Sequence, residues 1–427
     1  MSFVGGKSGV KYEAIPRGPD GRDEDPMNPR DQSQRHDAAA AALPWTLAAG
    51  LLFSLISISV FQGFLAIACA LWILILVKDK KRIQFPAYFW ALLVYAGLSL
   101  IASALSVNPQ ISFKDSRELL LFLIIPITCS ALVSESARKK TSAAVLASGA
   151  VSIVYSLYHY FFKAQAGERI PGFMGHYMTQ AGLLVLVCCL ALGFLFFGRQ
   201  KFRWVLAPGI ALAALCLVLT MTRSGWIGFG AALAVVLALT RPKWLAILPV
   251  AAVLVFFLSP QPVKRRALSI FSLKSYSNAQ RVQYLEAGIK IIAERPFFGT
   301  GPDTVDMVFQ DPKYGLSEEA KRNVHLHNNF TQIAAERGLP ALAAWLSFLI
   351  MASLALLKLT GRKSGRADLA PHAAAALAAL LAVVISGFFE YNFGDSEIAM
   401  LFFYLISVPF AGRGKTTTDE NNPPGLG

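Results

Sequence analysis

Two closely spaced histidines are the residues in this chain most suited to acid–base chemistry. His325 and His327 alternate in His325-Leu326-His327-Asn328-Asn329, so an extended segment would point both imidazoles to the same side. A neutral imidazole, with an unperturbed pKa of about 6.5, is a natural general base. A zinc site would need further His, Cys or carboxylate ligands, and none has suitable spacing. The pair indicates either a general base or two solvated loop histidines, and it predicts no metal.

Several arginines are suited to binding phosphate. Arg223 lies in a very short turn between two apolar runs, and Arg281 begins the stretch RVQYLEAGIKIIAE at 281–294. The planar fork of a guanidinium donates two parallel hydrogen bonds to a phosphate. The alternative for both is an ordinary arginine hydrated by bulk water. Arg265 and Arg266 belong to a basic cluster that could hold anionic lipid headgroups, the interpretation favoured here, or help to bind a diphosphate.

Weaker signals lie outside these motifs. Residues that could line a polar cavity, although such residues are more often solvated, are Lys114, Arg117, Arg169, His176, Glu390 and Asp395. Gly299 and Gly301 are spaced as in some nucleotide-binding loops, but no Walker lysine follows them. The sequence therefore predicts no nucleotide and no other cofactor.

The elements that position these residues are apolar. Of 427 residues, 55% are hydrophobic and 15% are charged, against roughly 45–50% and about 25% in soluble proteins. This composition excludes a disordered chain and argues against a soluble enzyme. The net charge of +14, from 40 basic and 26 acidic residues, fits basic residues at the cytoplasmic ends of membrane helices and needs no nucleic acid. The five cysteines lie in apolar runs, which predicts free thiols.

Apolar runs near the ~20 residues that cross a bilayer predict an all-α polytopic membrane protein with about twelve spans. The predicted spans are 44–60, 63–78, 86–105, 118–134, 141–162, 178–197, 203–221, 225–240, 243–259, 328–357, 371–389 and 396–411. Basic residues concentrate in alternate short loops, which predicts cytoplasmic termini. The sequence thus divides into a disordered cytoplasmic leader (1–43, with Met27 as an alternative natural start), nine spans (44–259), a large loop on the opposite side (260–327), three spans (328–411) and a cytoplasmic tail (412–427).

The large loop should contain one amphipathic helix near the membrane surface. Within 281–294 the apolar positions lie approximately on one helical face. They are Val282, Leu285, Ile289, Ile291 and Ile292. A turn at Pro296 and at Gly299-Thr300-Gly301-Pro302 should end this helix.

The chain resembles the O-antigen ligase/polymerase superfamily of bacterial envelope glycosyltransferases over about residues 44–411. Three features carry the resemblance: Thr222-Arg223-Ser224-Gly225, the stretch from Arg281 to Gly301 that ends in ERPFFGTG, and His327-Asn328 followed by Gly338. The ligase motif of this family is a histidine, a small polar residue, nine residues and a glycine, usually with Gly, Thr or Tyr three positions later. Ala341 departs from that last position.

The resemblance implies a metal-independent, inverting glycosyltransferase of the bacterial inner membrane, with a fold like the C-type glycosyltransferases and a large periplasmic loop. An O-antigen ligase transfers an O-antigen glycan from undecaprenyl diphosphate to lipid A–core on the periplasmic side. The implied roles are a general base for His327 and diphosphate binding for Arg223 and Arg281. Implied substrate contacts are Arg265, Arg266, Arg117, His325, Asn328 and Asn329.

Three alternatives remain open. The O-antigen polymerase and the protein O-oligosaccharyltransferase share this superfamily, although the second typically carries a longer periplasmic C-terminal domain. A transporter or flippase is an alternative of another class, but it predicts charges or broken helices near the bilayer midplane, and the predicted spans are almost free of charge there. The sequence predicts membrane lipids as partners and leaves the oligomeric state open.

Overall fold

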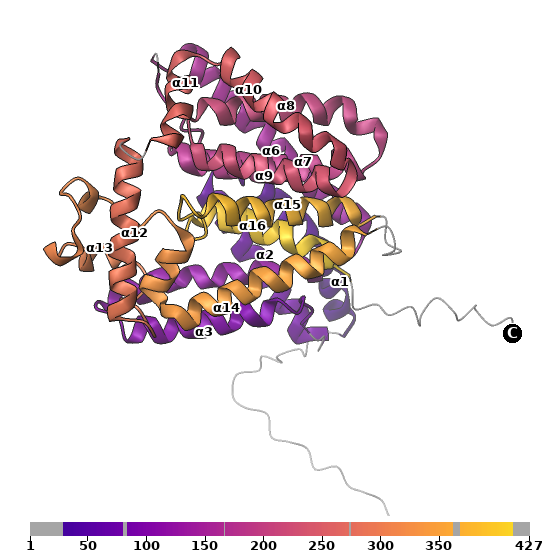
Figure 1. Cartoon of the computed structure of the whole chain (residues 1–427). Coiled ribbons are helices and arrows are strands. Elements are labelled where there is room, and N and C mark those ends of the chain that lie inside the picture. The colour runs from indigo at the N-terminus through magenta and orange to yellow at the C-terminus, as the bar shows by residue number, and fades with distance from the viewer. Residues whose placement is uncertain (1–28, 80–82, 166, 273–274, 362–367, 413–427) are drawn as a thin grey trace, which may run out of the picture.

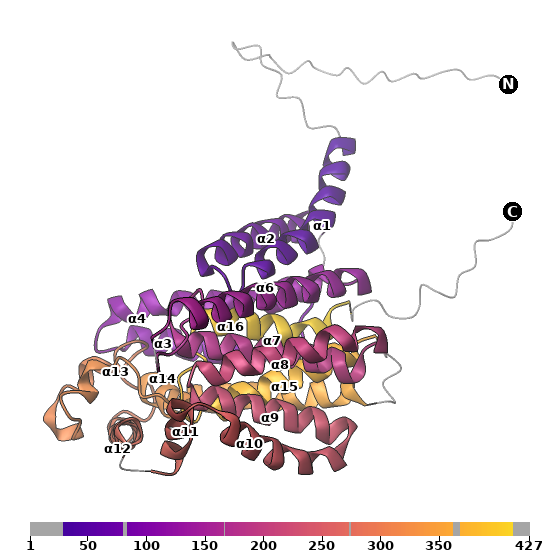
Figure 2. The same ribbon diagram turned by 90° about the horizontal axis from the view of Figure 1, so that it is seen from above.

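The protein is a bundle of helices with a smaller helical unit at one end (Figure 1). The computed structural model describes residues 29–79, 83–165, 167–272, 275–361 and 368–412, and within these ranges it contains helices and no strand. The predicted all-α class is therefore confirmed. Helices α11 (Gln261–Leu268), α12 (Tyr276–Glu294) and α13 (Val305–Val308) gather at one end of the bundle in both views (Figures 1 and 2). We call this the α12 end.

A helix is present at each predicted span. These helices are α1 (Pro29–Leu52), α2 (Ile58–Asp79), α3 (Phe89–Ala104), η1 (Ser116–Leu123) with α5 (Ile124–Ala131), α6 (Glu135–Phe162), α7 (Tyr177–Phe197), α8 (Arg203–Leu219), α9 (Arg223–Thr240), η3 (Pro242–Ala246) with α10 (Ile247–Leu258), α14 (Asn329–Thr360), α15 (Ala370–Ser386) and α16 (Ser396–Ser407). Five, within α2, α6, α7, α9 and α14, are long and apolar enough to cross a membrane, and six further apolar helices are shorter. The count of twelve spans stays a prediction.

The first helix begins earlier than the sequence indicates. Helix α1 starts at Pro29, inside the region 1–43 that was predicted to be disordered. A run of alanines from Ala38 to Ala42 explains the difference, because alanine has the highest intrinsic helix propensity. Residues 1–28, with Met27, and the tail from residue 413 lie outside the described part of the chain.

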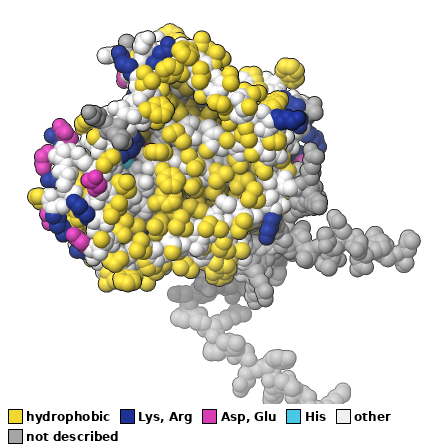
Figure 3. Space-filling view, in the orientation of Figure 1, with side chains coloured by type: hydrophobic (Ala, Val, Ile, Leu, Met, Phe, Trp, Pro, Cys, Tyr) yellow, Lys and Arg dark blue, Asp and Glu magenta, His cyan; other side chains and the backbone are white. Residues whose placement is uncertain are grey.

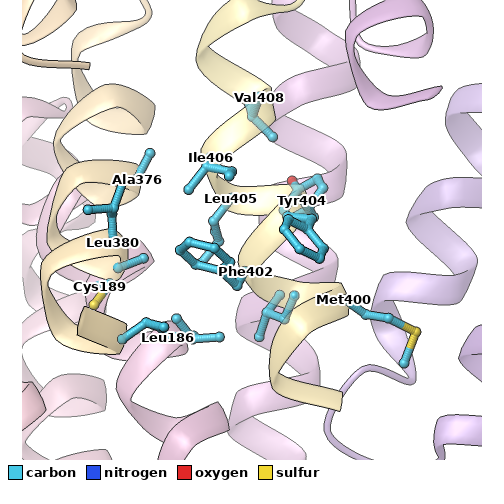
Figure 4. Close-up of a cluster of buried hydrophobic side chains, with 14 of the residues drawn as sticks. Leu186, Cys189, Ala376, Leu380, Met400, Phe402, Tyr404, Leu405, Ile406 and Val408 are labelled. Carbon is cyan, nitrogen blue, oxygen red and sulfur yellow. The ribbon is translucent and has the colours of Figure 1, made fainter. Parts of the chain in front are cut away.

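The centre of the bundle is packed through small residues. In α15 nearly every residue from Pro371 to Leu380 is buried, and most of them are alanines. Gly193 of α7 lies so close to α15 that an added Cβ would meet the Pro371 carbonyl oxygen at 2.3 Å. Figure 4 shows the larger apolar side chains of α7, α15 and α16 meeting in one cluster. Close contact between small residues is how helices associate in lipid, where apolar burial gives little driving force.

The outside of the bundle is apolar between two charged ends. Helix α10 buries none of its residues, and α2 exposes several large side chains, including Ile67, Leu74 and Val77. In Figure 3, hydrophobic side chains cover the middle of the face shown, while lysine, arginine, aspartate and glutamate gather toward its two ends. All five cysteines are free thiols, as predicted. This surface is that of a membrane protein, with lipid facing the apolar belt.

The large polar region after α10 is mostly helical. The amphipathic helix predicted at 281–294 is present as α12, which begins earlier, at Tyr276. Its predicted apolar face is only partly buried, because Val282, Leu285 and Ile289 are exposed by 42%, 45% and 57%. The face that packs against the neighbouring helices contains Ile291 of the predicted face together with Tyr284, Ala287 and Gly288.

Helix α14 is kinked in its first third, and two residues explain why. Pro340 has no N–H, and the N–H of Leu339 donates to the carbonyl of Pro296 at 2.8 Å instead of continuing the helix. The carbonyls of Ala335 and Glu336 therefore lose the partners that a regular helix would give them. Buried carbonyls without partners are costly, so other donors must replace these bonds.

The segment after α12 supplies those donors. The N–H groups of Thr300 and Gly301 donate to the two freed carbonyls, each at 2.9 Å. Gly338 at the kink has φ +82°, and an added Cβ there would meet the carbonyl oxygen of Phe297 at 2.0 Å, so only glycine allows this approach. The ERPFFGTG stretch thus ends α12 and fixes the kink of α14 at the same time.

Candidate active site

The candidate residues come from four parts of the chain that meet at the α12 end. A cavity of about 290 Å³ lies between the start of α9, helix α12, the segment before α14 and the loop between α15 and α16. We call it the arginine cavity, because Arg223 and Arg281 line it together with His327 and Asn328. Its remaining wall is mainly apolar and consists of Ile227, Ile270, Val282, Leu285, Leu326, Phe388 and Phe389, with Ser224 and Asn278. In Figure 3, basic and histidine atoms are visible in a hollow at this end.

Arg223 is held in place by neutral groups only. Its side chain donates to the carbonyl and hydroxyl oxygens of Ser269 at 2.9 and 3.1 Å, to the hydroxyl of Ser277 at 2.7 Å and to the amide oxygen of Asn278 at 2.6 Å. The residue is 6% exposed, so bulk water does not solvate it. In the described part of the chain no carboxylate lies within 4.0 Å of this guanidinium, so its charge is oriented but not neutralised.

Arg281 has most of its hydrogen-bonding capacity free. Its Nε donates to the carbonyl of Phe389 at 3.1 Å, and the two terminal NH₂ groups have no hydrogen-bond partner among the described residues. Burial lowers the pKa of Arg281, and the nearby Glu390 carboxylate opposes this shift. The residue that begins the amphipathic stretch thus faces the arginine cavity rather than open solvent.

Two further arginines support the turn before Arg223. Arg169 and Arg266 both donate to the carbonyl of Met221, at 2.6 and 3.3 Å. Met221 has φ +51°, a left-handed conformation that is rare for methionine. Burial lowers the pKa of Arg266, and the positive charges of Arg169 and Arg281 lower it further. An excess of positive charge that no described carboxylate pairs with makes this region a candidate anion site.

His327 is paired with a carboxylate that the sequence did not connect to it. Its Nδ1 lies 2.9 Å from Oε1 of Glu390. The carboxylate favours the proton on Nδ1, which leaves Nε2 of a neutral imidazole free to accept a proton. Burial alone would raise the pKa of Glu390, but the hydrogen bond and charge of His327 and the charge of Arg281 hold it below its ordinary value. This is the arrangement of an oriented general base.

His325 takes a different position from His327. Its ring lies 5.2 Å from that of Tyr391, and its Nδ1 is buried without a hydrogen-bond partner in the described part of the chain. Burial lowers the pKa of His325, and the charge of His327 lowers it further. His325 does not line the arginine cavity; it lines a second one.

The two asparagines after His327 hold the backbone in place. Asn328 caps α14 by accepting from the N–H of Thr331 at 3.0 Å, and its amide donates to the carbonyl of Phe388 at 3.0 Å. Asn329 is fully buried and donates to the side chain of Asn392 at 2.7 Å. Asn328 still lines the arginine cavity, whereas Asn329 does not.

Two other predicted contact residues lie away from the cavity. Arg117 is exposed and its Nε donates to the carbonyl of Lys114 at 3.0 Å. Arg265 is also exposed, although the adjacent Arg266 is turned toward Met221 and Ser277. The structure therefore brings together Arg223, Arg266, Arg281, His327 and Asn328, and leaves these two residues at the surface.

The second cavity has the opposite charge. It has a volume of about 400 Å³, and we call it the carboxylate cavity because its lining includes Glu118, Glu390, Asp395 and Glu397 but no lysine or arginine. Other polar residues in its wall are His176, Thr222, Ser224, His325, Ser386, Tyr391, Asn392 and Ser396. Ser224 lines both cavities. His327 faces one cavity and Glu390 the other, so this pair forms part of the partition between them.

Acidic and sulfur-bearing residues do not assemble into a metal site in the described ranges. No group of three or more His, Cys, Asp or Glu side chains there is arranged to hold a metal ion. The metal-independent mechanism stays a prediction.

Comparison with known proteins gives one family match. Residues 208–346 match the family described as O-antigen ligase. The matched segment runs from α8 to the first half of α14 and so contains Arg223, Arg281 and His327. None of the curated proteins compared with the chain matches it. Over residues 208–346 the chain is therefore similar to the O-antigen ligase/polymerase superfamily.

Proposed function

We propose that this protein is an O-antigen ligase. It would transfer a glycan from undecaprenyl diphosphate to lipid A–core at the periplasmic side of the bacterial inner membrane. The observation that supports this most strongly is the arginine cavity, in which Arg223 and Arg281 lie beside the His327–Glu390 pair and no described carboxylate lies within 4.0 Å of either guanidinium.

The donor lipid fits the two kinds of surface in this cavity. Arg223 and Arg281 would bind the diphosphate, because guanidinium–phosphate hydrogen bonds are strong and directional. The apolar wall would receive the first isoprene units of the tail, with Val282 and Leu285 of α12 on one side. The same arginines would stabilise the negative charge that develops on the diphosphate as it leaves.

The chemical step would use the histidine and its carboxylate. Nε2 of His327 would take the proton of an acceptor hydroxyl while that oxygen attacks the anomeric carbon of the donor sugar. The bond between this carbon and the diphosphate oxygen breaks, and its electron pair leaves with the diphosphate, which inverts the configuration. Glu390 would hold the imidazole in the required tautomer and stabilise the imidazolium that forms.

The carboxylate cavity would hold sugar of the acceptor. Carboxylates and hydroxyls accept hydrogen bonds from sugar hydroxyl groups, and a volume of about 400 Å³ lies in the range of ligand sites. Because no lysine or arginine lines this cavity, it would disfavour phosphorylated or carboxylated sugars and accept neutral or amino sugars.

A reconstituted transfer assay tests the function. Purified protein would be mixed with undecaprenyl-diphosphate-linked O-antigen in the presence of EDTA, with and without lipid A–core. Glycosylated lipopolysaccharide that forms only with lipid A–core would support the ligase. Longer lipid-linked glycan formed without lipid A–core would replace the ligase by the polymerase, and no product of either kind would contradict both.

A further inference from the structure

A buried charged cluster of Arg337, Asp115 and Glu336 contacts the loop 387–395, and none of these three residues lines either of the two large cavities. Its centre is Arg337, the residue before the kink glycine of α14, whose side chain is 8% exposed. One terminal nitrogen donates to the carboxylate of Asp115 at 2.9 Å, and the other donates to Glu336 at 2.7 Å and to the hydroxyl of Tyr391 at 3.3 Å. These partners come from the end of α4 (Pro109–Asp115), from α14 itself and from the loop before α16.

Such a cluster is not explained by stability alone. Replacing buried ion pairs with apolar groups is often neutral or stabilising, because removing two charges from water costs about as much as their attraction returns. The kink explains how α14 positions Arg337, since the helix interruption begins immediately after it at Gly338. A buried guanidinium that joins three separate elements is suited to fixing their relative positions.

The loop that Arg337 contacts carries the carboxylate partner of the candidate base. Tyr391 directly follows Glu390, and Glu390 binds Nδ1 of His327 at 2.9 Å. Between Gly387 and Asp395 this loop has no regular secondary structure beyond isolated turns, so side-chain contacts must hold it in place.

The ring of Tyr391 is confined as well. An added Cβ at Gly394 would meet a Tyr391 ring carbon at 2.2 Å, and the ring of His325 lies 5.2 Å away on another side. A displaced Tyr391 would therefore move the backbone on which Glu390 lies. Asn329 anchors the next residues, by its bonds to Asn392 and to the N–H of Phe393.

We propose that Arg337 is a positioning residue for the reaction. By binding the Tyr391 hydroxyl, Arg337 keeps Glu390 in the position where the Glu390 carboxylate contacts His327. Asp115 and Glu336 fix the orientation of the Arg337 guanidinium. The catalytic part of this inference rests on the proposed function, because it assigns the orienting contact that the general base needs. The structural part, that Arg337 fixes the loop 387–395, stands on the contacts alone.

Steady-state kinetics test the catalytic part with two variants. Tyr391→Phe removes only the hydroxyl that Arg337 contacts, and Arg337→Lys keeps the charge but cannot reproduce the fork. Each should lower kcat about tenfold and leave the KM for the lipid-linked donor within about twofold, because the change affects the base and not the diphosphate site. Tyr88→Phe is the matched control, since Tyr88 is a buried tyrosine whose hydroxyl donates to Ile406 far from the site.

Hydrogen–deuterium exchange tests the structural part without any transfer activity. In Tyr391→Phe and Arg337→Lys, peptides covering 387–395 should exchange about tenfold faster than in wild type, while peptides of α15 and the Tyr88→Phe control should not change. Unchanged exchange and unchanged kcat in Tyr391→Phe would overturn the proposal, even if Arg337→Lys failed to fold. A wild-type protein that transfers no glycan would contradict the proposed function, whereas the exchange result would still decide the role of Arg337.

Discussion

The arginine cavity and the carboxylate cavity lie on either side of one His–Glu pair, yet they differ in almost every physical property. The first is walled by apolar side chains and two arginines, and the second is walled by four carboxylates and many hydroxyl and amide groups. The arginines of the first cavity would attract a diphosphate, and the carboxylates of the second would repel it. Electrostatics alone would therefore direct a diphosphate lipid to the first cavity and leave the second to a sugar without anionic groups. The pair that divides them can contact both substrates, which is what a transfer reaction needs.

The two cavities also differ in how they are built. Only the arginine cavity includes helix α12, and only the carboxylate cavity includes helices α7, α15 and α16; both include the start of α9, the segment before α14 and the α15–α16 loop. The first therefore depends on the smaller helical unit and on the ERPFFGTG stretch that fixes α14. Substitutions in each should affect one substrate and spare the other.

The largest effect on the transfer rate should come from the His327–Glu390 pair that separates the two cavities. His327→Ala removes the proposed base and should lower the transfer rate by about 10²–10⁴-fold, the range that general-base catalysis contributes. The KM for the donor should change little, because the diphosphate site remains. Initial rates with saturating substrates measure this, with His159→Ala as control because His159 lines neither cavity. A loss smaller than about fivefold would remove His327 from the chemical step.

Substitutions in the arginine cavity should have a smaller effect, which is confined to kcat/KM for the donor. Arg281→Met removes the guanidinium whose NH₂ groups have no hydrogen-bond partner among the described residues. Loss of a charge-assisted hydrogen bond costs about 1.5–3 kcal/mol, so kcat/KM for the donor should fall about 10- to 150-fold. Arg265→Met is the matched control, because Arg265 is exposed outside the cavity. Equal effects of the two substitutions would show that the cavity does not select the diphosphate.

Substitutions in the wall of the carboxylate cavity should change the KM for the acceptor. Glu397→Gln removes one carboxyl group from the wall of this cavity and should raise the acceptor KM about two- to tenfold, the size of one ordinary hydrogen bond. The KM for the donor should stay the same. In the control Glu319→Gln, the KM values for donor and acceptor should both stay the same, because Glu319 is exposed on the smaller helical unit. An acceptor ending in a uronic acid should be used less well by wild type than by Glu397→Gln. A change in donor KM instead would assign this cavity to the donor glycan.

The smallest effect should be on stability at low pH. The pKa of Glu390 is held below its ordinary value of 4.5, so its ionised form stabilises the folded protein above that value and this contribution is lost as the pH falls through the lower, folded pKa. The Tm difference between wild type and Glu390→Gln should therefore shrink as the pH falls below 4.5. Thermal unfolding in detergent measures it, and a difference that persists unchanged well below pH 4.5 would contradict the pairing with His327.

Much of the fold could be predicted because each helix is indicated by the residues within it. Apolar runs of about 20 residues mark membrane helices without any knowledge of tertiary contacts. The kink of α14 was missed although Gly338 and Pro340 stand in its sequence, because the donors that make it tolerable, Thr300 and Gly301, lie on another segment.

The site could be predicted only in part, since spacing does not reveal partners far along the chain. Glu390 lies 63 positions from His327, and no local pattern connects them. Arg265 and Arg266 are neighbours in sequence, but successive residues of a helix point about 100° apart, so only Arg266 reaches the site. Asn329 was predicted to contact substrate, whereas its buried amide binds Asn392.

The most direct test of the account is a cryo-electron microscopy structure with undecaprenyl diphosphate bound in a lipid nanodisc. The account predicts density for the diphosphate within hydrogen-bonding distance of Arg223 and Arg281, the tail leaving along the apolar wall by Val282 and Leu285, and Nε2 of His327 facing the sugar-bearing end. Diphosphate density in the carboxylate cavity, or away from both arginines, would contradict it.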